Sequence, residues 1–245
     1  MSVDLLAVGD VMVDVVAGPP VEIRAGGSAV NAAAAVKRVS GTALVVGCIG
    51  DDALGDFVRH ELDRRGVDAR LAVVPGAPTG RVLVSGSEVV PERGANAYFS
   101  AEHLPQVEAR AVLVSGYQLL RDDSGPGTEA ALAAGGVVGV DLGSARRVRD
   151  YGVDRARSLL AAADVVFGSD EAIAELGPLD GVLSVATLGA DGARAGDVWV
   201  RPPNVLPGEL LGAGDILAAT VMVALADGLT VADALERGCA SACAA

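Results

Sequence analysis

The stretch PGELLGAGDILAAT, residues 207–220, leads from closely spaced glycines through an aspartate into an apolar run typical of a buried helix. Glycine adopts backbone angles that other residues avoid, so the N–H groups of Gly212, Ala213 and Gly214 can converge on one point. A helix N-terminus at that point favours negative charge. The stretch therefore predicts an anion hole with Asp215 beside it. An aspartate at a helix start is also a common cap, worth about 1 kcal/mol, so both interpretations stay open here.

The two interpretations give Asp215 different tasks. If the hole holds a phosphoryl group, Asp215 cannot bind the same anion, because both are negative. Its natural role is then to accept a proton from a hydroxyl that attacks the phosphoryl group. If Asp215 only caps the helix, neither a bound phosphoryl group nor an attacking hydroxyl is needed beside it.

Working outward from this stretch, short apolar runs alternate with helix-like segments. Continuous apolar runs suit strands buried on both faces, and their alternation with helices favours a parallel sheet covered on both sides. The length of 245 residues, 51% of them hydrophobic, allows one large core. We therefore predict a single α/β domain over residues 1–245, three-layered and doubly wound around a mostly parallel sheet. The predicted strands are 5–8, 11–16, 43–49, 82–84, 112–115, 137–140, 165–167 and 183–187, and the predicted helices are 29–39, 53–65, 128–134, 155–163, 171–176, 215–226 and 231–244.

Two segments, about 11–25 and 68–100, break the alternation. They are extended, rich in valine, glycine and proline, and lack a helix pattern. We expect them to form a few antiparallel strands that project from the main sheet as a small β-strand lid.

Ligands of such sheets collect where strands lead into helices, which draws attention to RAGGSAVNAAAAVKRVSG, residues 24–41. Gly26 and Gly27 let the backbone approach a ligand closely, and Asn31 offers a donor and an acceptor to a polyol. Asp14, after the first strand, could accept hydrogen bonds from two neighbouring hydroxyls. A capped glycine turn and a solvated loop aspartate would explain the same residues.

A fourth stretch, VATLGADGARA, covers residues 185–195. Gly189 and Gly192 could leave a flat slot for a base and ribose. An ordinary hairpin turn explains the stretch as well.

Composition and missing motifs exclude several other functions. A net charge of −13 makes nucleic acid a poor partner. The chain has no Gly-x-x-x-x-Gly-Lys motif and only two histidines. Three cysteines without paired spacing and the absence of a secretory or membrane-spanning pattern indicate a cytoplasmic protein without a membrane partner.

In this order, the stretches resemble the ribokinase-like (PfkB) carbohydrate kinase family. The resemblance covers nearly the whole chain and includes GDVMVD (9–14), GGSAVNAAAAVKRVSG (26–41), VLVSGSEVVPERGAN (82–96), ADVVFGSDEAIAELG (163–177), TLGADGARA (187–195) and LGAGD (211–215). It implies an ATP-dependent phosphotransferase that acts on a sugar or nucleoside alcohol, with Mg²⁺ arriving on the nucleotide.

The resemblance also implies roles for individual residues. Asp215 would be the general base, and the backbone of residues 212–214 the anion hole. The substrate would be bound by Asp14, Gly26, Gly27, Asn31, Arg93 and Asn96, and the nucleotide by Ser169, Thr187, Gly189 and Gly192. Exposed strands of the lid would allow a homodimer.

Two departures from the family pattern qualify these expectations. Glu209-Leu210-Leu211 stands where many members have an Asp-Thr pair, which leaves a monovalent cation doubtful as a cofactor. Ser169-Asp170-Glu171-Ala172 replaces Asn-x-x-Glu, which leaves Glu171 or Asp170 as substitutes, and Glu171 is the one considered for the metal. The alternatives are a catalytically weak sugar-binding or regulatory member of the same fold and a nucleoside kinase.

Overall fold

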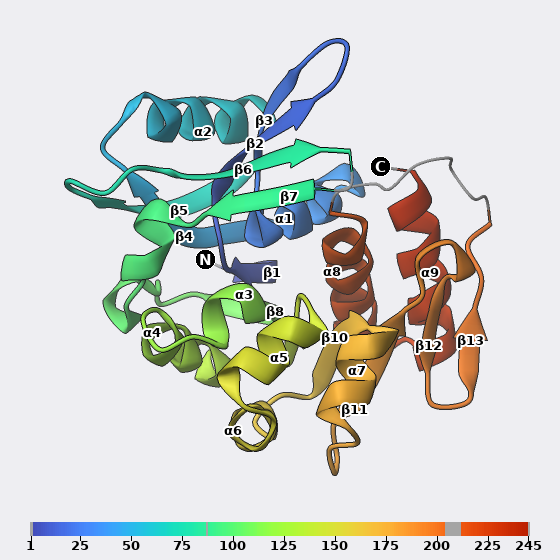
Figure 1. Cartoon of the computed structure of the whole chain (residues 1–245). Coiled ribbons are helices and arrows are strands. Elements are labelled where there is room, and N and C mark those ends of the chain that lie inside the picture. The colour runs from blue at the N-terminus through green and yellow to red at the C-terminus, as the bar shows by residue number, and fades with distance from the viewer. Residues whose placement is uncertain (1, 87, 204–211, 245) are drawn as a thin grey trace.

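The computed structural model describes residues 2–86, 88–203 and 212–244, and the stretch 209–211 therefore lies outside the described residues. Within them, a nine-stranded sheet has the order β13-β12-β11-β10-β9-β8-β1-β4-β5 (Figure 1). The seven strands from β11 to β5 run parallel to one another, whereas β12 and β13 add antiparallel strands at the β11 edge. The strands are β1 (Ser2–Val8), β4 (Ala43–Gly50), β5 (Asp68–Val74), β8 (Glu108–Ser115), β9 (Val137–Asp141), β10 (Val165–Ser169), β11 (Leu183–Thr187), β12 (Ala193–Ala195) and β13 (Val198–Val200).

Two hydrophobic cores, one on each face of this sheet, make the three layers. Successive side chains of a strand point to opposite faces, so Leu5 and Ala7 of β1 enter one core while Leu6 and Val8 enter the other. The first core is closed by α1 (Ser28–Arg38), α2 (Ala53–Arg64), α8 (Ala213–Ala226) and α9 (Val231–Cys243). The second is closed by α3 (Gly116–Leu119), η3 (Ala130–Ala133), α5 (Ala145–Tyr151), α6 (Val153–Leu160) and α7 (Asp170–Leu176), while α4 (Gly125–Glu129) packs against α3 and η3. The predicted three-layer, mostly parallel α/β fold is confirmed.

A separate four-stranded sheet, the small sheet, projects beyond the main body at the top of Figure 1. It has the order β3-β2-β6-β7 and consists of β2 (Met12–Ala17), β3 (Glu22–Gly26), β6 (Gly80–Ser85) and β7 (Glu88–Glu92). The pairs β2–β3 and β6–β7 are antiparallel, but β2 and β6 are parallel, which the sequence did not indicate.

The predicted lid segment 68–100 is too long at both ends. Residues 68–74 form β5, which pairs with β4 at the edge of the large sheet. Residues 94–98 and 101–103 form the short helices η1 (Gly94–Tyr98) and η2 (Ala101–His103). An edge strand alternates half-buried and exposed residues, so its pattern does not distinguish the two sheets.

Two of the helix predictions were incomplete. The predicted helix 128–134 divides into α4 and η3, and α5 was missed although Ser144 caps its first turn and Gly152 ends it. No helix in residues 2–86, 88–203 and 212–244 is long and apolar enough to span a membrane.

The parallel strands end along one edge, where the functional residues collect. Ser115 at the end of β8 pairs with Asp141 at the end of β9, and Ser169 of β10 pairs with Thr187 of β11. Side chains that follow these strands are therefore brought together although they are far apart in sequence.

Candidate active site

Asp215 lies in the first turn of α8 but does not cap it. The cap position belongs to Gly212, and no side chain caps this end of the helix. The Asp215 carboxylate instead accepts a hydrogen bond from Asn31 of α1, with 2.9 Å between Nδ2 and Oδ2. The plain-cap interpretation is therefore wrong, since the carboxylate is held by another helix.

The backbone around Gly212 fits the predicted anion hole. Gly212 has φ of 89°, in the left-handed region, and a Cβ there would overlap the amide group of Asn31. The N–H groups of the first helical turn have no acceptor within the helix. Among the described residues, no atom lies within 4 Å of the place where a Cβ at Gly214 would stand.

Asp14 and the Gly26–Gly27 pair form a close-packed corner between the small sheet and α1. Asp14, on β2, is 2% exposed, and a Cβ at Gly26 would overlap its carboxyl group. Arg24 Nε lies 3.6 Å from Asp14 Oδ2, which has no hydrogen-bond partner among the described residues. Burial raises the pKa of Asp14 despite the opposing charge of Arg24.

Gly27 has a different role from Gly26. Its φ is +92°, and a Cβ there would meet the backbone of Asp10 and Met12. Glycine at this position is needed for α1 to begin directly behind the loop that follows β1.

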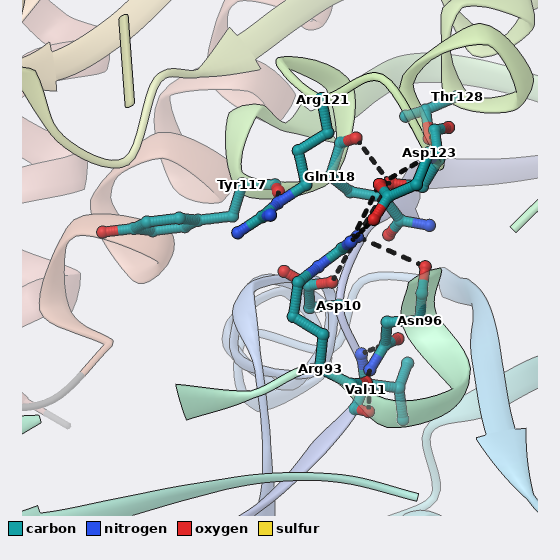
Figure 2. A network of polar contacts seen from close by, with 10 residues as sticks. Asp10, Val11, Arg93, Asn96, Tyr117, Gln118, Arg121, Asp123 and Thr128 are labelled. Carbon is teal, nitrogen blue, oxygen red and sulfur yellow. Dashed lines mark hydrogen bonds and ion pairs between the residues drawn. The ribbon is translucent and has the colours of Figure 1, made fainter. Parts of the chain in front are cut away.

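Arg93 and Asp10 meet on the other side of that loop (Figure 2). Arg93 Nη2 lies 3.8 Å from Asp10 Oδ1, and Nη1 donates to both carboxylate oxygens of Asp123 at 2.8 and 2.9 Å. Asp10 is 5% exposed, and burial raises its pKa more than Arg93 lowers it. Arg93 therefore lies beside Asp10, and its binding of a substrate stays a prediction.

Asn96 has a different role from the predicted one. Its side chain is fully buried, its Nδ2 donates to the carbonyls of Val11 and Arg93, and its Oδ1 accepts from the N–H of Val11 (Figure 2). Both ends of the amide are occupied by backbone, so Asn96 fastens η1 to the loop after β1 and does not face a ligand.

The electrostatic environment of Asp215 suits a base. The pKa of Asp215 is raised to about 7, chiefly by burial and then by the negative charges of Asp141, Asp14 and Asp10, against the lowering effect of the hydrogen bond from Asn31. These four carboxyl groups lie near enough to one another for their charges to interact. A carboxylate whose pKa lies near neutral pH can accept a proton and release it again.

The predicted nucleotide residues lie together at the ends of β10 and β11. Ser169 Oγ accepts from the N–H of Ala172 and caps α7, while Thr187 Oγ1 donates to the Gly168 carbonyl at 3.2 Å. Gly189 and Gly192 have φ of +58° and +94° and frame the turn between β11 and β12. The predicted hairpin is therefore present, with open space beside Gly189.

Glu171, the residue considered for the metal, faces away from this edge. Its side chain is 72% exposed and lies 3.3 Å from Arg149. Within the described ranges no group of three or more His, Cys, Asp or Glu could hold a metal ion. The structure therefore gives no support to Glu171 as a ligand.

Four residues at the same edge were not among the predicted site residues. Asp141 ends β9, Tyr117 and Arg121 lie in and after α3, and Arg147 lies in α5. Their positions could have indicated them, because each follows a predicted strand within twelve residues. They were missed because no distinctive motif surrounds them.

Comparison with known proteins agrees with this geometry. The family model described as pfkB family carbohydrate kinase matches residues 3–245. An ATP-dependent ribose-1-phosphate kinase of Halopiger xanaduensis is 32% identical over 90% of this chain and 79% of its own length. A fructokinase of Klebsiella pneumoniae is 29% identical over 92% of this chain and 85% of its own length.

A solved structure of similar fold is the fructokinase of Vibrio cholerae O395 with fructose, ADP and calcium ion bound. It has a TM-score of 0.81 and 24% identity, covering 96% of this chain and 89% of that one. Both the expected family and the expected fold are thereby confirmed. The chain belongs to the pfkB family of carbohydrate kinases, and it is a phosphotransferase whose acceptor is a hydroxyl group of a sugar or nucleoside.

Proposed function

We propose that the protein transfers the γ-phosphoryl group of ATP to a sugar hydroxyl, with Asp215 as the general base. The observation that carries this proposal is the Asp215 carboxylate, which is held by Asn31 rather than used as a cap and whose pKa is raised to about 7. Asp215 accepts the hydroxyl proton while the sugar oxygen bonds to the γ-phosphorus and the bond from phosphorus to the ADP oxygen breaks.

The first turn of α8 supports the transferring group in this proposal. The N–H groups of Ala213 and Gly214 and the positive end of the helix stabilise the negative charge that develops on the phosphoryl oxygens. The turn that begins at Gly189 supports the base and ribose. Mg²⁺ carried by the nucleotide would supply further neutralisation of the phosphate charge.

The small sheet takes the place of a lid in the proposal. It carries Asp14 on β2 and joins the main body through the Gly26–Gly27 corner. Closing it over the sugar would exclude water and so limit hydrolysis of ATP.

The outer face of the small sheet supports the expected homodimer. Ile23, Val15, Leu83 and Val90 lie opposite one another across β3, β2, β6 and β7. Ile23, Leu83 and Val90 are 56%, 48% and 55% exposed. A second copy of this sheet would cover that row of apolar side chains.

The names of the relatives differ on one aspect of the substrate. One is named for a sugar that already carries a phosphate, and the other for fructose. Both kinds of acceptor have a hydroxyl for Asp215 to deprotonate. The choice between them depends on residues of this chain elsewhere in the pocket.

The decisive experiment compares Asp215→Asn with a matched control, Asp233→Asn. Asp233 occupies the third position of α9 as Asp215 does of α8, but it faces its own cap residue, Thr230. We expect Asp215→Asn to lower kcat by about 10²- to 10⁴-fold, and Asp233→Asn to leave it unchanged. ATP consumption across a panel of sugars and nucleosides is the measurement. Saturable sugar binding without turnover by the parent protein would instead favour the weak or regulatory alternative.

A further inference from the structure

Three arginines from separate segments of the chain come together near Asp10. Arg93 precedes η1, Arg121 follows α3, and Arg147 lies in α5. Figure 2 shows the side chains of Arg93 and Arg121 extending toward the region of Asp10. Arg147 lies near these two arginines. The pKa of Arg121 is lowered chiefly by burial and then by the positive charges of Arg93 and Arg147. We call these three residues the arginine cluster.

Two members of the arginine cluster lack a carboxylate partner. Arg93 is paired with Asp123, but neither Arg121 nor Arg147 forms an ion pair in the part of the chain that the structure describes. Arg121 Nε donates to the carbonyl of Tyr117 at 2.8 Å, whereas Arg147 Nε is buried without a hydrogen-bond partner among those residues. Apart from Arg121 Nε, the guanidinium donors of both therefore have no hydrogen-bond acceptor among the described residues.

Other polar atoms around the cluster are also buried and unsatisfied. Among the described residues, Asp10 Oδ1, Ser115 Oγ and both amide atoms of Gln118 have no hydrogen-bond partner. Ser115 is 4% exposed and Gln118 is fully buried. Buried polar groups are normally paired, and three neighbouring positive charges repel one another. An anion that also carries hydroxyl groups would pair with the buried polar atoms and would offset the repulsion among the arginines.

Tyr117 lies near both the arginine cluster and the base. The Tyr117 ring packs against Gly143, and its phenol group is close enough to respond to Asp141, Asp215 and Arg147. Arg147 and Asp215 thus approach the same aromatic side chain. A ligand bound to the cluster would extend past Tyr117 toward Asp215.

We propose that the arginine cluster is an anion subsite and that the acceptor is a sugar already bearing a phosphate monoester. Arg121 and Arg147 bind the phosphate, and the positive charge of Arg93 strengthens this binding without direct contact. A free hydroxyl of the sugar faces Asp215. The inference rests on the proposed function for the role of that hydroxyl. Two guanidinium forks offer more donors than one carboxylate accepts, which favours phosphate over a sugar acid.

The first test compares acceptors with and without a phosphate. ATP consumption is measured with ribose 1-phosphate, ribose 5-phosphate and fructose 6-phosphate, against ribose, fructose and gluconate. We expect at least one phosphorylated sugar to exceed all the others in kcat/KM by about 100-fold, as expected for charge-assisted contacts. Equal or better use of ribose, fructose or gluconate would overturn the inference.

The second test removes the arginines one at a time. Arg121→Met and Arg147→Met should raise KM for the phosphorylated sugar by about 10- to 100-fold, while kcat changes less. The matched control is Arg146→Met, since Arg146 is the neighbour of Arg147 on α5 but is 84% exposed and paired with Asp150. Thermal melting identifies any variant that fails to fold. An unchanged KM in both folded cluster variants would also overturn the inference.

A binding measurement separates this inference from the proposed function. Calorimetry with Asp215→Asn, using the same sugar phosphates and inorganic phosphate, needs no turnover. If no acceptor stimulates ATP consumption but sugar phosphate binds and Arg147→Met abolishes binding, the proposed function fails and the subsite stands. If plain sugars are phosphorylated and sugar phosphates do not bind, the function stands and the subsite fails.

Discussion

The two halves of the strand edge are built differently. On the substrate side, Asp10 and Asp14 are 5% and 2% exposed, and each has a carboxylate oxygen without a partner among the described residues. On the nucleotide side, Asp170 and Glu171 lie in exposed ion pairs with Arg194 and Arg149. The carboxylates of the first half are buried, whereas those of the second are exposed to solvent.

This difference indicates where the folded protein gives up stability by burying charged groups. Buried, incompletely paired charges cost stability, and proteins retain them where a ligand or a reaction uses them. In the proposed function the nucleotide would need only the open surface that the described residues leave next to Gly189, because ATP would bring its own charge and metal. Selectivity is therefore expected from the substrate side and tolerance from the nucleotide side.

The largest expected effect on kcat tests this contrast with one glycine near Asp215 and one glycine on the nucleotide side. Gly212→Ala and Gly189→Ala both place a side chain at positive φ, which costs about 1–2 kcal/mol of stability in either case. Only at Gly212 would the new Cβ also strike Asn31. We expect kcat to fall by about 100-fold in Gly212→Ala and to change little in Gly189→Ala.

Steady-state kinetics on both folded variants make the measurement. A similar loss in the two variants would show that the halves contribute alike. That result would remove the basis for the contrast.

The next effect is on the pH dependence of turnover. Because Asp215 must be ionised to act as a base, kcat should fall about tenfold per pH unit below its pKa of about 7. The hydrogen bond from Asn31 lowers this pKa, so Asn31→Ala should move the acidic limb to higher pH. The acceptor's own ionisation is the same for both proteins, so the displacement between their profiles reports on Asp215. An acidic limb that stays in place would contradict the coupling.

A smaller effect is expected on stability. The pKa of Asp215 is raised from 3.8 to about 7, so the folded chain holds this proton more tightly than the unfolded chain. Ionising Asp215 therefore costs stability as the pH rises from about 4 to 7. Asp215→Asn should melt at a higher temperature than the parent at pH 8, with the gap closing toward pH 4. A lower melting temperature at pH 8 would contradict this.

The smallest effect concerns assembly rather than catalysis. Leu83→Glu, in the apolar row of the small sheet, should shift a dimer toward monomer in analytical ultracentrifugation. Val39→Glu is the control, since Val39 is 65% exposed at the end of α1, away from that sheet. A parent protein that sediments as a monomer would exclude the dimer proposal.

Sequence reasoning predicted most of the large sheet and several of the residues at its edge. Strand runs such as 43–49 and 165–167 are continuous and apolar because both of their faces are covered. Asp215 and Asn31 stood out because closely spaced glycines precede them, and Asp14 because it follows the first strand. Glu171 and Asn96 were less well predicted, since a side chain's direction and its hydrogen-bond partners depend on the neighbours that folding supplies.

The sequence by itself determined the alternation of strands and helices, the family and the glycine turn before Asp215, because these follow from local patterns of side chains. Only the tertiary structure decided that Asp215 is hydrogen-bonded to Asn31, 184 residues away, and that Arg93, Arg121 and Arg147 come together near Asp10. The physical reason is that a parallel sheet joins strand ends distant in sequence, so the charge environment of the site is a property of the fold.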